Sequence, residues 1–216
     1  GYVDDIAPAD ALVAYVLRAP VAHARIVGLD LDAARMHDGV QLVITAADLQ
    51  AAGVALDMTA STVTNLDGSQ GAAPMRPLLA QDRVRFAGEA VAVVIADSLE
   101  LARDAAEQVV VDYEELPVHL SLQAGGEPLH SEAPENRAFD WGFGTKDATE
   151  AAFDKAAHRV CLRIDDNRVI VNSLEPRGCF AEWGDNRLHL SVNGQGVWNQ
   201  KTALSRCWVS PLSRCG

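Results

Sequence analysis

The sequence has 216 residues, of which 49% are hydrophobic and 22% charged, and its 30 acidic and 18 basic side chains give a formal net charge of −12. This composition is typical of a globular protein with one large or two small domains, and the acidic balance argues against nucleic-acid binding because phosphate backbones would be repelled. No apolar run approaches the roughly 18 residues of a membrane-spanning helix. Residues 1–10 lack the basic start and apolar core of a signal peptide, and the four cysteines form no C-x-x-C pair. We therefore expect reduced thiols and a cytoplasmic protein.

Hydrophobic periodicity predicts short strands and helices over the first 56 residues. Strands are expected at residues 11–18, 25–31 and 40–45. A short helix over residues 31–37 would end at Gly39. Thr45 and Asp48 have the three-residue spacing of a capping box, which predicts the start of a helix that Gly53 stops.

The next segment combines a long loop with the clearest unit of the sequence. Residues 57–76 are rich in Thr, Ser, Asn, Asp, Gly and Pro and predict a surface loop. A buried strand follows at residues 89–96, then a helix capped by Ser98 and a strand at residues 109–113. One broad face of that helix is apolar, formed by Leu99, Ala102, Ala105, Ala106 and Val109. This order of elements predicts a β-α-β unit with a right-handed crossover.

The composition changes near residue 123, where a second lobe is expected to begin. Residues 123–141 are rich in Gly, Pro, Glu and Asn and predict a linker. Asp147 or Thr149 would cap the following helix, whose apolar stripe contains Phe153, Ala156 and Ala157. The remaining strands are expected at residues 159–164, 177–183 and 187–193.

General catalytic and binding motifs are lacking, and the candidates have structural alternatives. His158 and Cys161 have a spacing that often arises by chance, so a metal site there is disfavoured. The glycines of residues 141–144 suit either a cofactor loop or, better, a turn before a helix, because no strand precedes them. Adjacent acids at residues 4–5, 114–115 and 165–166 indicate solvated turns more than acid–base pairs. In residues 175–177, Glu-Pro-Arg, the arginine could clamp an anion, or an ion pair could pin the loop.

An ordered series of short motifs resembles the large subunit shared by xanthine dehydrogenases, aldehyde oxidases and carbon monoxide dehydrogenases. The series begins with Gly-Tyr-Val-Asp-Asp-Ile at residues 1–6 and Arg-Ala-Pro-Val-Ala-His-Ala-Arg-Ile at residues 18–26. It continues with Gly-Val at residues 39–40, Thr-Ala-Ala-Asp-Leu at residues 45–49, residues 77–92, Val-Asp-Tyr-Glu-Glu-Leu-Pro at residues 111–117, residues 151–158, residues 167–168 and Glu-Pro-Arg at residues 175–177. Ala19 and Ala90 replace the usual Ser and Pro of these motifs. The order and spacing of these motifs are more specific to the family than any single motif is.

This resemblance implies an α+β fold, in which an aldehyde oxidase/xanthine dehydrogenase α/β hammerhead domain precedes a truncated start of the molybdopterin-binding domain. The expected boundaries are residues 1–122 for the hammerhead, 123–146 for the linker and 147–206 for the start of the second domain. A truncated second domain would leave apolar surface and sheet edges uncovered, so we expect it to be poorly ordered and a protease-resistant core to end near residues 120–135.

The family's chemistry is an oxidation of aldehydes, purines, other heterocycles or carbon monoxide that takes its oxygen from water. The resemblance implies a molybdenum–pterin cofactor, commonly the cytosine dinucleotide form in bacterial relatives, with [2Fe-2S] clusters and FAD on partner subunits or domains. Gln195 stands at the position of the family's glutamine that donates a hydrogen bond to a molybdenum ligand. Its structural alternative is an amide that caps a turn. We assign no catalytic residue and no protein metal ligand, and we expect the isolated chain to be inactive; a non-catalytic subunit-docking module is the alternative.

The final residues, 207–216, depart from the family pattern. One permitted codon spelling of this tail, read two bases later, translates as Leu-Gly-Ile-Ser-Pro-Glu-Pro-Val-Arg, which resembles the family's continuation. We therefore hypothesise a frameshift after about Arg206, which would leave Cys207 and Cys215 without a function.

Overall fold

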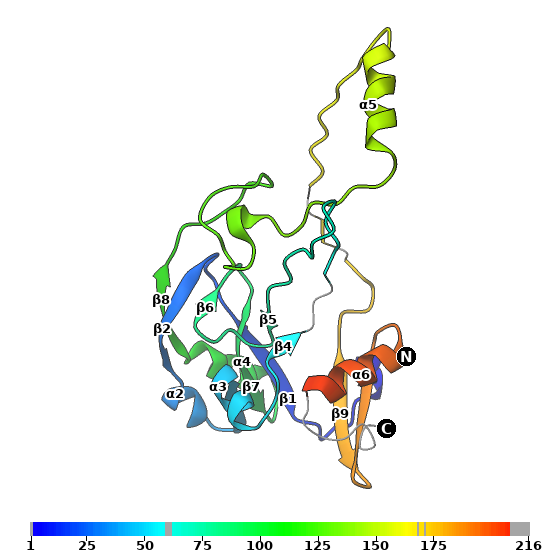
Figure 1. Ribbon diagram of the computed structural model, residues 1–216. Helices are drawn as coiled ribbons and strands as arrows, with labels where there is room; N and C mark the ends of the chain where they lie inside the picture. The colour runs from blue at the N-terminus through cyan, green and yellow to red at the C-terminus, as the bar shows by residue number, and fades with distance from the viewer. Residues whose placement is uncertain (1, 59–61, 168, 171, 208–216) are drawn as a thin grey trace.

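The computed structural model describes residues 2–58, 62–167, 169–170 and 172–207 (Figure 1). Its first sheet has the strand order β1-β7-β3, with β1 at Val13–Arg18, β7 at Ala90–Ala96 and β3 at Val40–Thr45. Both neighbours pair antiparallel with β7, the central strand. β7 is buried on both faces, with Val91 on one and Val94 on the other, as expected for a central strand that is rich in β-branched residues. The three strands predicted here are confirmed.

Helix α4, Leu99–Glu107, covers this sheet and completes the larger core. The Ser98 hydroxyl accepts a hydrogen bond from the Leu101 amide at 3.3 Å, so the predicted N-cap is confirmed. The short helix α2, Asp32–Arg35, packs beside α4 and β3. The buried residues of this core are Leu31, Ala34, Val43, Val94, Ala96, Ala102, Ala105 and Ala106. Small alanines on α4 bring the helix close to the sheet.

A second sheet has the order β6-β2-β8, with β6 at Arg83–Val84, β2 at Ala24–Asp30 and β8 at Val110–Glu115. Both outer strands pair antiparallel with β2. A smaller core lies against it, formed by Ala19, Ala24, Ala80, Val84 and Val91. Since Val91 belongs to β7, that strand contributes to both cores and links the two sheets.

The expected β-α-β unit is wrong in its pairing. β7, α4 and β8 do follow one another in the chain, but β7 and β8 lie in different sheets, and each pairs antiparallel with other strands. The local pattern that predicted strand, helix and strand was correct. It contained no information on pairing, which depends on β1, β2 and β3 from the preceding part of the chain.

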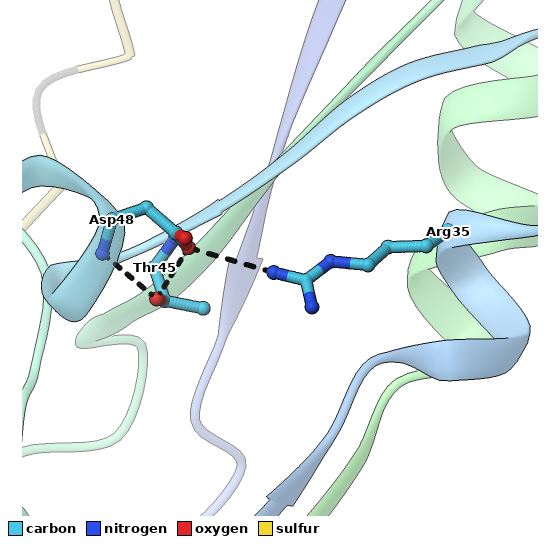
Figure 2. A network of polar contacts seen from close by, with 3 residues as sticks. All are labelled: Arg35, Thr45 and Asp48. Atoms are coloured by element: carbon cyan, nitrogen blue, oxygen red, sulfur yellow. Dashed lines mark hydrogen bonds and ion pairs between the residues drawn. The ribbon is translucent and has the colours of Figure 1, made fainter.

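Helix α3, Ala46–Ala51, begins with the predicted capping box, which is confirmed. The Thr45 hydroxyl accepts from the Asp48 amide at 3.4 Å, and Asp48 Oδ2 accepts from the Thr45 amide at 2.8 Å and from the Thr45 hydroxyl at 2.6 Å (Figure 2). Arg35 Nη2 lies 3.8 Å from the same carboxylate oxygen. These contacts, first of all the Thr45 hydroxyl, lower the pKa of Asp48 below its ordinary 3.8. Gly53 follows the helix with a φ of +75°, which suits glycine.

The long loop and the predicted linker are bound to each other. The loop contains β4, Asp57–Met58, and is followed by β5, Arg76–Pro77, which pairs with it. Two amides of the loop donate to carbonyls of the segment that follows β8. The Ala72 amide donates to the Ala138 carbonyl at 2.7 Å, and the Leu66 amide donates to the Asp140 carbonyl at 2.9 Å. The segment from 123 to 140 includes only a short 3₁₀ helix, Pro134–Asn136. Its irregular backbone therefore follows the surface of the first lobe up to residue 140.

Helix α5, Lys146–Lys155, stands away from the two sheets (Figure 1). Its N-cap is Thr145, without a side-chain hydrogen bond, so the predicted cap at Asp147 or Thr149 is wrong. The preceding Gly144 has a φ of +98°, and this turn begins the helix earlier than expected. The apolar stripe of α5 is exposed to solvent.

The strand expected at residues 159–164 is also wrong. The segment runs back beside α5 without strand structure, and Val160 and Ile164 are 92% and 76% exposed (Figure 1). Its alternating pattern suits a strand, but among the described residues no second strand pairs with it, and a strand needs a partner for its backbone groups.

The described C-terminal part is a hairpin followed by a helix. β9, Cys179–Gly184, and β10, Arg187–Val192, pair antiparallel through a two-residue turn, Asp185–Asn186, in which both φ angles are positive. The two strands predicted here are confirmed. Helix α6, Val197–Cys207, packs near β4, and the Ala55 amide donates to the Cys207 carbonyl at 2.9 Å. None of the helices in the described ranges has the length and hydropathy required to cross a membrane.

Candidate cofactor-contact site

The turn between β10 and α6 presents the predicted contact residue, Gln195. This residue is exposed, and its side-chain amide makes no hydrogen bond within the described part of the chain. Its carbonyl lies 3.5 Å from Gln200 Nε2, which donates to it from the first turns of α6. The next residue, Gly196, has a φ of +77°, which lets the chain turn sharply into the helix. The Gln195 amide is thus free to donate to a bound group.

Asn193 fixes the base of this turn. Its Oδ1 accepts from the Gly178 amide at 2.9 Å, and its Nδ2 donates to the Pro176 carbonyl at 2.6 Å. The side chain therefore connects the end of β10 to the segment that leads into β9. Because it satisfies a backbone donor and a backbone acceptor together, Asn193 holds the Gln195 turn beside the Glu-Pro-Arg motif.

Glu175, in that motif, contacts the beginning of the chain. Its Oε1 accepts from the Val3 amide at 3.1 Å, at the start of helix α1, Val3–Ile6. No ion pair of Glu175 or Arg177 occurs among the described residues, so the carboxylate pins the segment by a hydrogen bond. The structure thus brings together three motifs that are far apart in sequence. Each motif is recognisable in the sequence, but no sequence signal predicts that they are adjacent in space.

The other sequence candidates lie apart from this turn. His158 and Cys161 are exposed, and no group of three or more His, Cys, Asp or Glu side chains positioned to hold a metal occurs in the described ranges. Trp141 and Phe143 stack with ring centroids 6.4 Å apart at 17° in the exposed turn before α5. In the acidic pairs, Glu114 lies 3.4 Å from Arg25. These contacts are those of surface residues.

Gln195 suits a contact to a metal that is held by a cofactor. A neutral amide donates hydrogen bonds without adding charge beside the metal, and this amide is exposed and has no partner in the described part of the chain. The arrangement can therefore orient a ligand atom.

Comparisons with known proteins identify both lobes. Residues 1–117 match the family "Aldehyde oxidase and xanthine dehydrogenase, a/b hammerhead domain", and residues 129–214 match the "Molybdopterin cofactor-binding domain". The sequence-based boundaries at residues 122 and 146 remain predictions. The hypothesis of a frameshifted tail concerns residues that, from 208 onward, lie outside the described residues.

Curated relatives cover nearly the whole chain. The large subunit of nicotine 6-hydroxylase from Paenarthrobacter nicotinovorans is 38% identical over 94% of this chain and 25% of its own length. The carbon monoxide dehydrogenase large chain from Hydrogenophaga pseudoflava is 35% identical over 98% of this chain and 27% of its own length. The chain thus spans about a quarter of the length of these relatives.

Solved structures agree with the sequence comparisons. Quinoline 2-oxidoreductase from Pseudomonas putida 86 matches 99% of this chain with a TM-score of 0.79 and 30% identity, over 27% of its own chain. A Cu,Mo-containing carbon monoxide dehydrogenase matches 100% of this chain with a TM-score of 0.77 and 28% identity, over 28% of its own chain. The antiparallel sheets, the hairpin and the order of the two matched domains lead to one assignment. The chain belongs to the aldehyde oxidase and xanthine dehydrogenase family of molybdenum hydroxylases, as a hammerhead domain followed by the start of the molybdopterin-binding domain.

Proposed function

We propose that this chain forms the N-terminal part of the large subunit of a molybdenum-dependent oxidoreductase and contributes Gln195 to the cofactor site. The observation that carries the proposal is the side-chain amide of Gln195, which makes no hydrogen bond in the described part of the chain and lies on the turn into α6, within the segment that matches a cofactor-binding domain. When bound, the molybdenum–pterin group supplies Lewis-acid and electron-acceptor chemistry.

The residues around Gln195 would hold the backbone of its turn in place. Asn193 holds the turn against the Pro176 carbonyl, and Glu175 holds the same segment against the Val3 amide. Because the backbone of the turn is fixed in advance, only the Gln195 side chain has to be ordered when its amide binds an acceptor. The role of the hammerhead lobe is then to support the turn, because α1 connects the start of that lobe to Glu175.

The complete enzyme would hydroxylate an aldehyde, a purine or another heterocycle, or oxidise carbon monoxide, with water as the oxygen source. The names of the relatives support this range, since they include a nicotine hydroxylase, a carbon monoxide dehydrogenase and an aldehyde oxidoreductase. The proposed partners are an iron–sulfur subunit and an FAD subunit, which carry [2Fe-2S] clusters and FAD. We also propose a cytosine dinucleotide form of the pterin and a cytoplasmic location.

The chain of 216 residues should not catalyse turnover alone. It spans about a quarter of the relatives' length, so most of a relative's large subunit has no counterpart in it. The test is to purify the chain from a host that makes the molybdenum cofactor and to measure dye reduction with nicotine, an aldehyde and carbon monoxide. Rates at background are expected, and metal-dependent turnover by the chain would contradict the proposal.

Gln195 is tested in the complete large subunit, assembled with its partners. Gln195→Ala should lower kcat or molybdenum content by about 10- to 100-fold, as is typical when a hydrogen bond around a metal site is lost. The matched control is Gln123→Ala, which removes an exposed amide in the segment between the lobes. If both variants matched the unmodified enzyme, Gln195 would have only a structural role. Absence of molybdenum from the unmodified complex would favour the alternative of a subunit-docking module.

A further inference from the structure

We propose that a cavity between β5, β6 and residues 127–132 binds a phosphate group through Arg83, Arg85 and His130. The cavity has a volume of about 740 Å³, which is within the usual range for small-molecule sites. It lies in the hammerhead lobe and the segment that follows it, so the inference does not depend on the proposed function of Gln195.

Two arginines on either side of Val84 line the cavity. Val84 is fully buried in the smaller core, so Arg83, which precedes it in β6, points to the opposite face of the strand, and Arg85 is the first residue after the strand. Both are half-buried and line the cavity. Arg85 Nε donates to the Leu129 carbonyl at 3.2 Å, while the side chain of Arg83 has no hydrogen bond or ion pair among the described residues. Most of the N–H groups of the two guanidinium ions thus remain available to a ligand.

Arg83 stands in an unfavourable electrostatic position as long as no anion is bound. It pairs directly with Arg25 across the β2–β6 ladder, and like charges opposite one another destabilise a sheet. Arg25 is compensated by Glu114, whose Oε2 lies 3.4 Å from its Nη1. Arg83 has no such partner in the described ranges. A bound oxyanion would supply the missing negative charge.

The pKa of His130 depends on the charged groups around this cavity. Its pKa is lowered, first by burial and then by the charge of Arg85, with smaller contributions of the same sign from Arg83 and His23. Glu132 acts in the opposite direction. His23 is itself buried, and its Nε2 has no hydrogen-bond partner in the described structure. The positive field of the arginines thus outweighs the nearby carboxylate at the position of His130.

The other residues that line the cavity suit a phosphate that is attached to an apolar organic group. Asp82, Glu127 and Glu132 also line the cavity, but all three are exposed, so solvent and salt screen their charges more than those of the half-buried arginines. An apolar part of the wall is formed by Val54, Leu56, Met75 and Pro77. The ligand class is therefore phosphate, either as the free ion or as an ester of a small organic molecule.

The test compares three probes on the full chain: inorganic phosphate, phenyl phosphate and the neutral phenol. Calorimetry measures affinity, and NMR follows the imidazole of His130, whose pKa should rise when an anion binds beside it. Arg83→Gln is the informative variant because the Arg83 side chain makes no hydrogen bond or ion pair in the described ranges, and the substitution keeps the backbone that pairs with β2. Arg137→Gln is the control, since it removes the same charge from an exposed position.

Arg83→Gln should weaken phenyl phosphate binding by about tenfold or more, as expected for losing a charged hydrogen-bond donor, while Arg137→Gln should change it by less than about twofold. Tighter binding of phenyl phosphate than of inorganic phosphate would support an ester ligand, and equal binding would support the free ion. Equal weakening by the two variants, binding of phenol as tight as that of phenyl phosphate, or no response of His130 to either phosphate would overturn the proposal.

Discussion

The two lobes of this protein use similar apolar residues but bury them very differently. In the hammerhead lobe, Val94 of the central strand is fully buried. In the second lobe, Val160 is 92% exposed, and none of the described residues from 141 onward is buried. The alternating pattern around Val160 resembles that of a strand, yet no strand forms there. An apolar pattern therefore produces a core only where a second element is available to cover it.

The helices show the same contrast. Ser98 caps α4, whose alanines are buried against the first sheet. Thr145 precedes α5 without a side-chain hydrogen bond, and none of the described residues in α5 is buried. Because isolated helices of this length are marginal in water, α4 gains its stability from packing, whereas α5 lacks that contribution.

Limited proteolysis should separate the two lobes most clearly. The described residues between 141 and 174 are exposed and include trypsin sites at Lys146, Lys155, Arg159 and Arg163. We expect the first cuts there, and a resistant N-terminal fragment that extends to about residue 140, because Ala72 and Leu66 bond to Ala138 and Asp140. The fragments are identified by mass spectrometry. A resistant core that reached residue 206 would contradict the conclusion that the second lobe is less well packed than the first.

The same substitution in each lobe should have different effects on stability. Val94→Ala removes two methyl groups from a fully packed site and should cost about 2 kcal/mol of unfolding free energy. Val160→Ala makes the same chemical change at an exposed site and should stay within about 0.5 kcal/mol of the unmodified protein. Urea unfolding followed by circular dichroism measures both. Equal effects would show that Val160 is also packed in solution.

Removal of a threonine hydroxyl provides a smaller test. Thr45→Ala loses the N-cap of α3 and should cost about 1 kcal/mol. Thr149→Ala removes a hydroxyl that donates to the Thr145 carbonyl within the exposed α5, and it should change stability by less than about 0.5 kcal/mol. The same urea experiment compares them. An effect of Thr149→Ala as large as that of Thr45→Ala would mean that α5 belongs to the cooperative core.

The smallest expected effect is the pH dependence of the capping box. Hydrogen bonds from Thr45 lower the pKa of Asp48 below its ordinary 3.8, so the charged form is stabilised by folding. This contribution is complete above the unfolded pKa and is lost as the pH falls below about 3.8 through the folded value. The stability difference between the unmodified protein and Asp48→Asn should therefore shrink between about pH 6 and about pH 3. Asp10→Asn, at an exposed site, serves as the control, and a difference that is constant with pH would contradict the assignment.

Local chemistry in the sequence was sufficient for the elements of the first lobe. The capping box at Thr45 and Asp48, the N-cap at Ser98 and the strand at residues 40–45 depend on residues that are near one another in the chain, and each was predicted correctly. The ordered family motifs likewise led to the correct family and to the two-domain order. The contact role of Gln195 remains a prediction.

Tertiary structure decided which segments meet. It placed β7 and β8 in different sheets, where the sequence pattern predicted one β-α-β unit, and it left residues 159–164 without a strand. It also brought Glu175 to Val3 and Asn193 to Pro176 at the Gln195 turn. Side-chain periodicity and capping depend on neighbours within a few residues, so the sequence alone was sufficient for α3 and α4 of the first lobe, although not for the cap of the exposed α5. Strand pairing and burial depend on surfaces from distant parts of the chain, and only the folded arrangement supplies those.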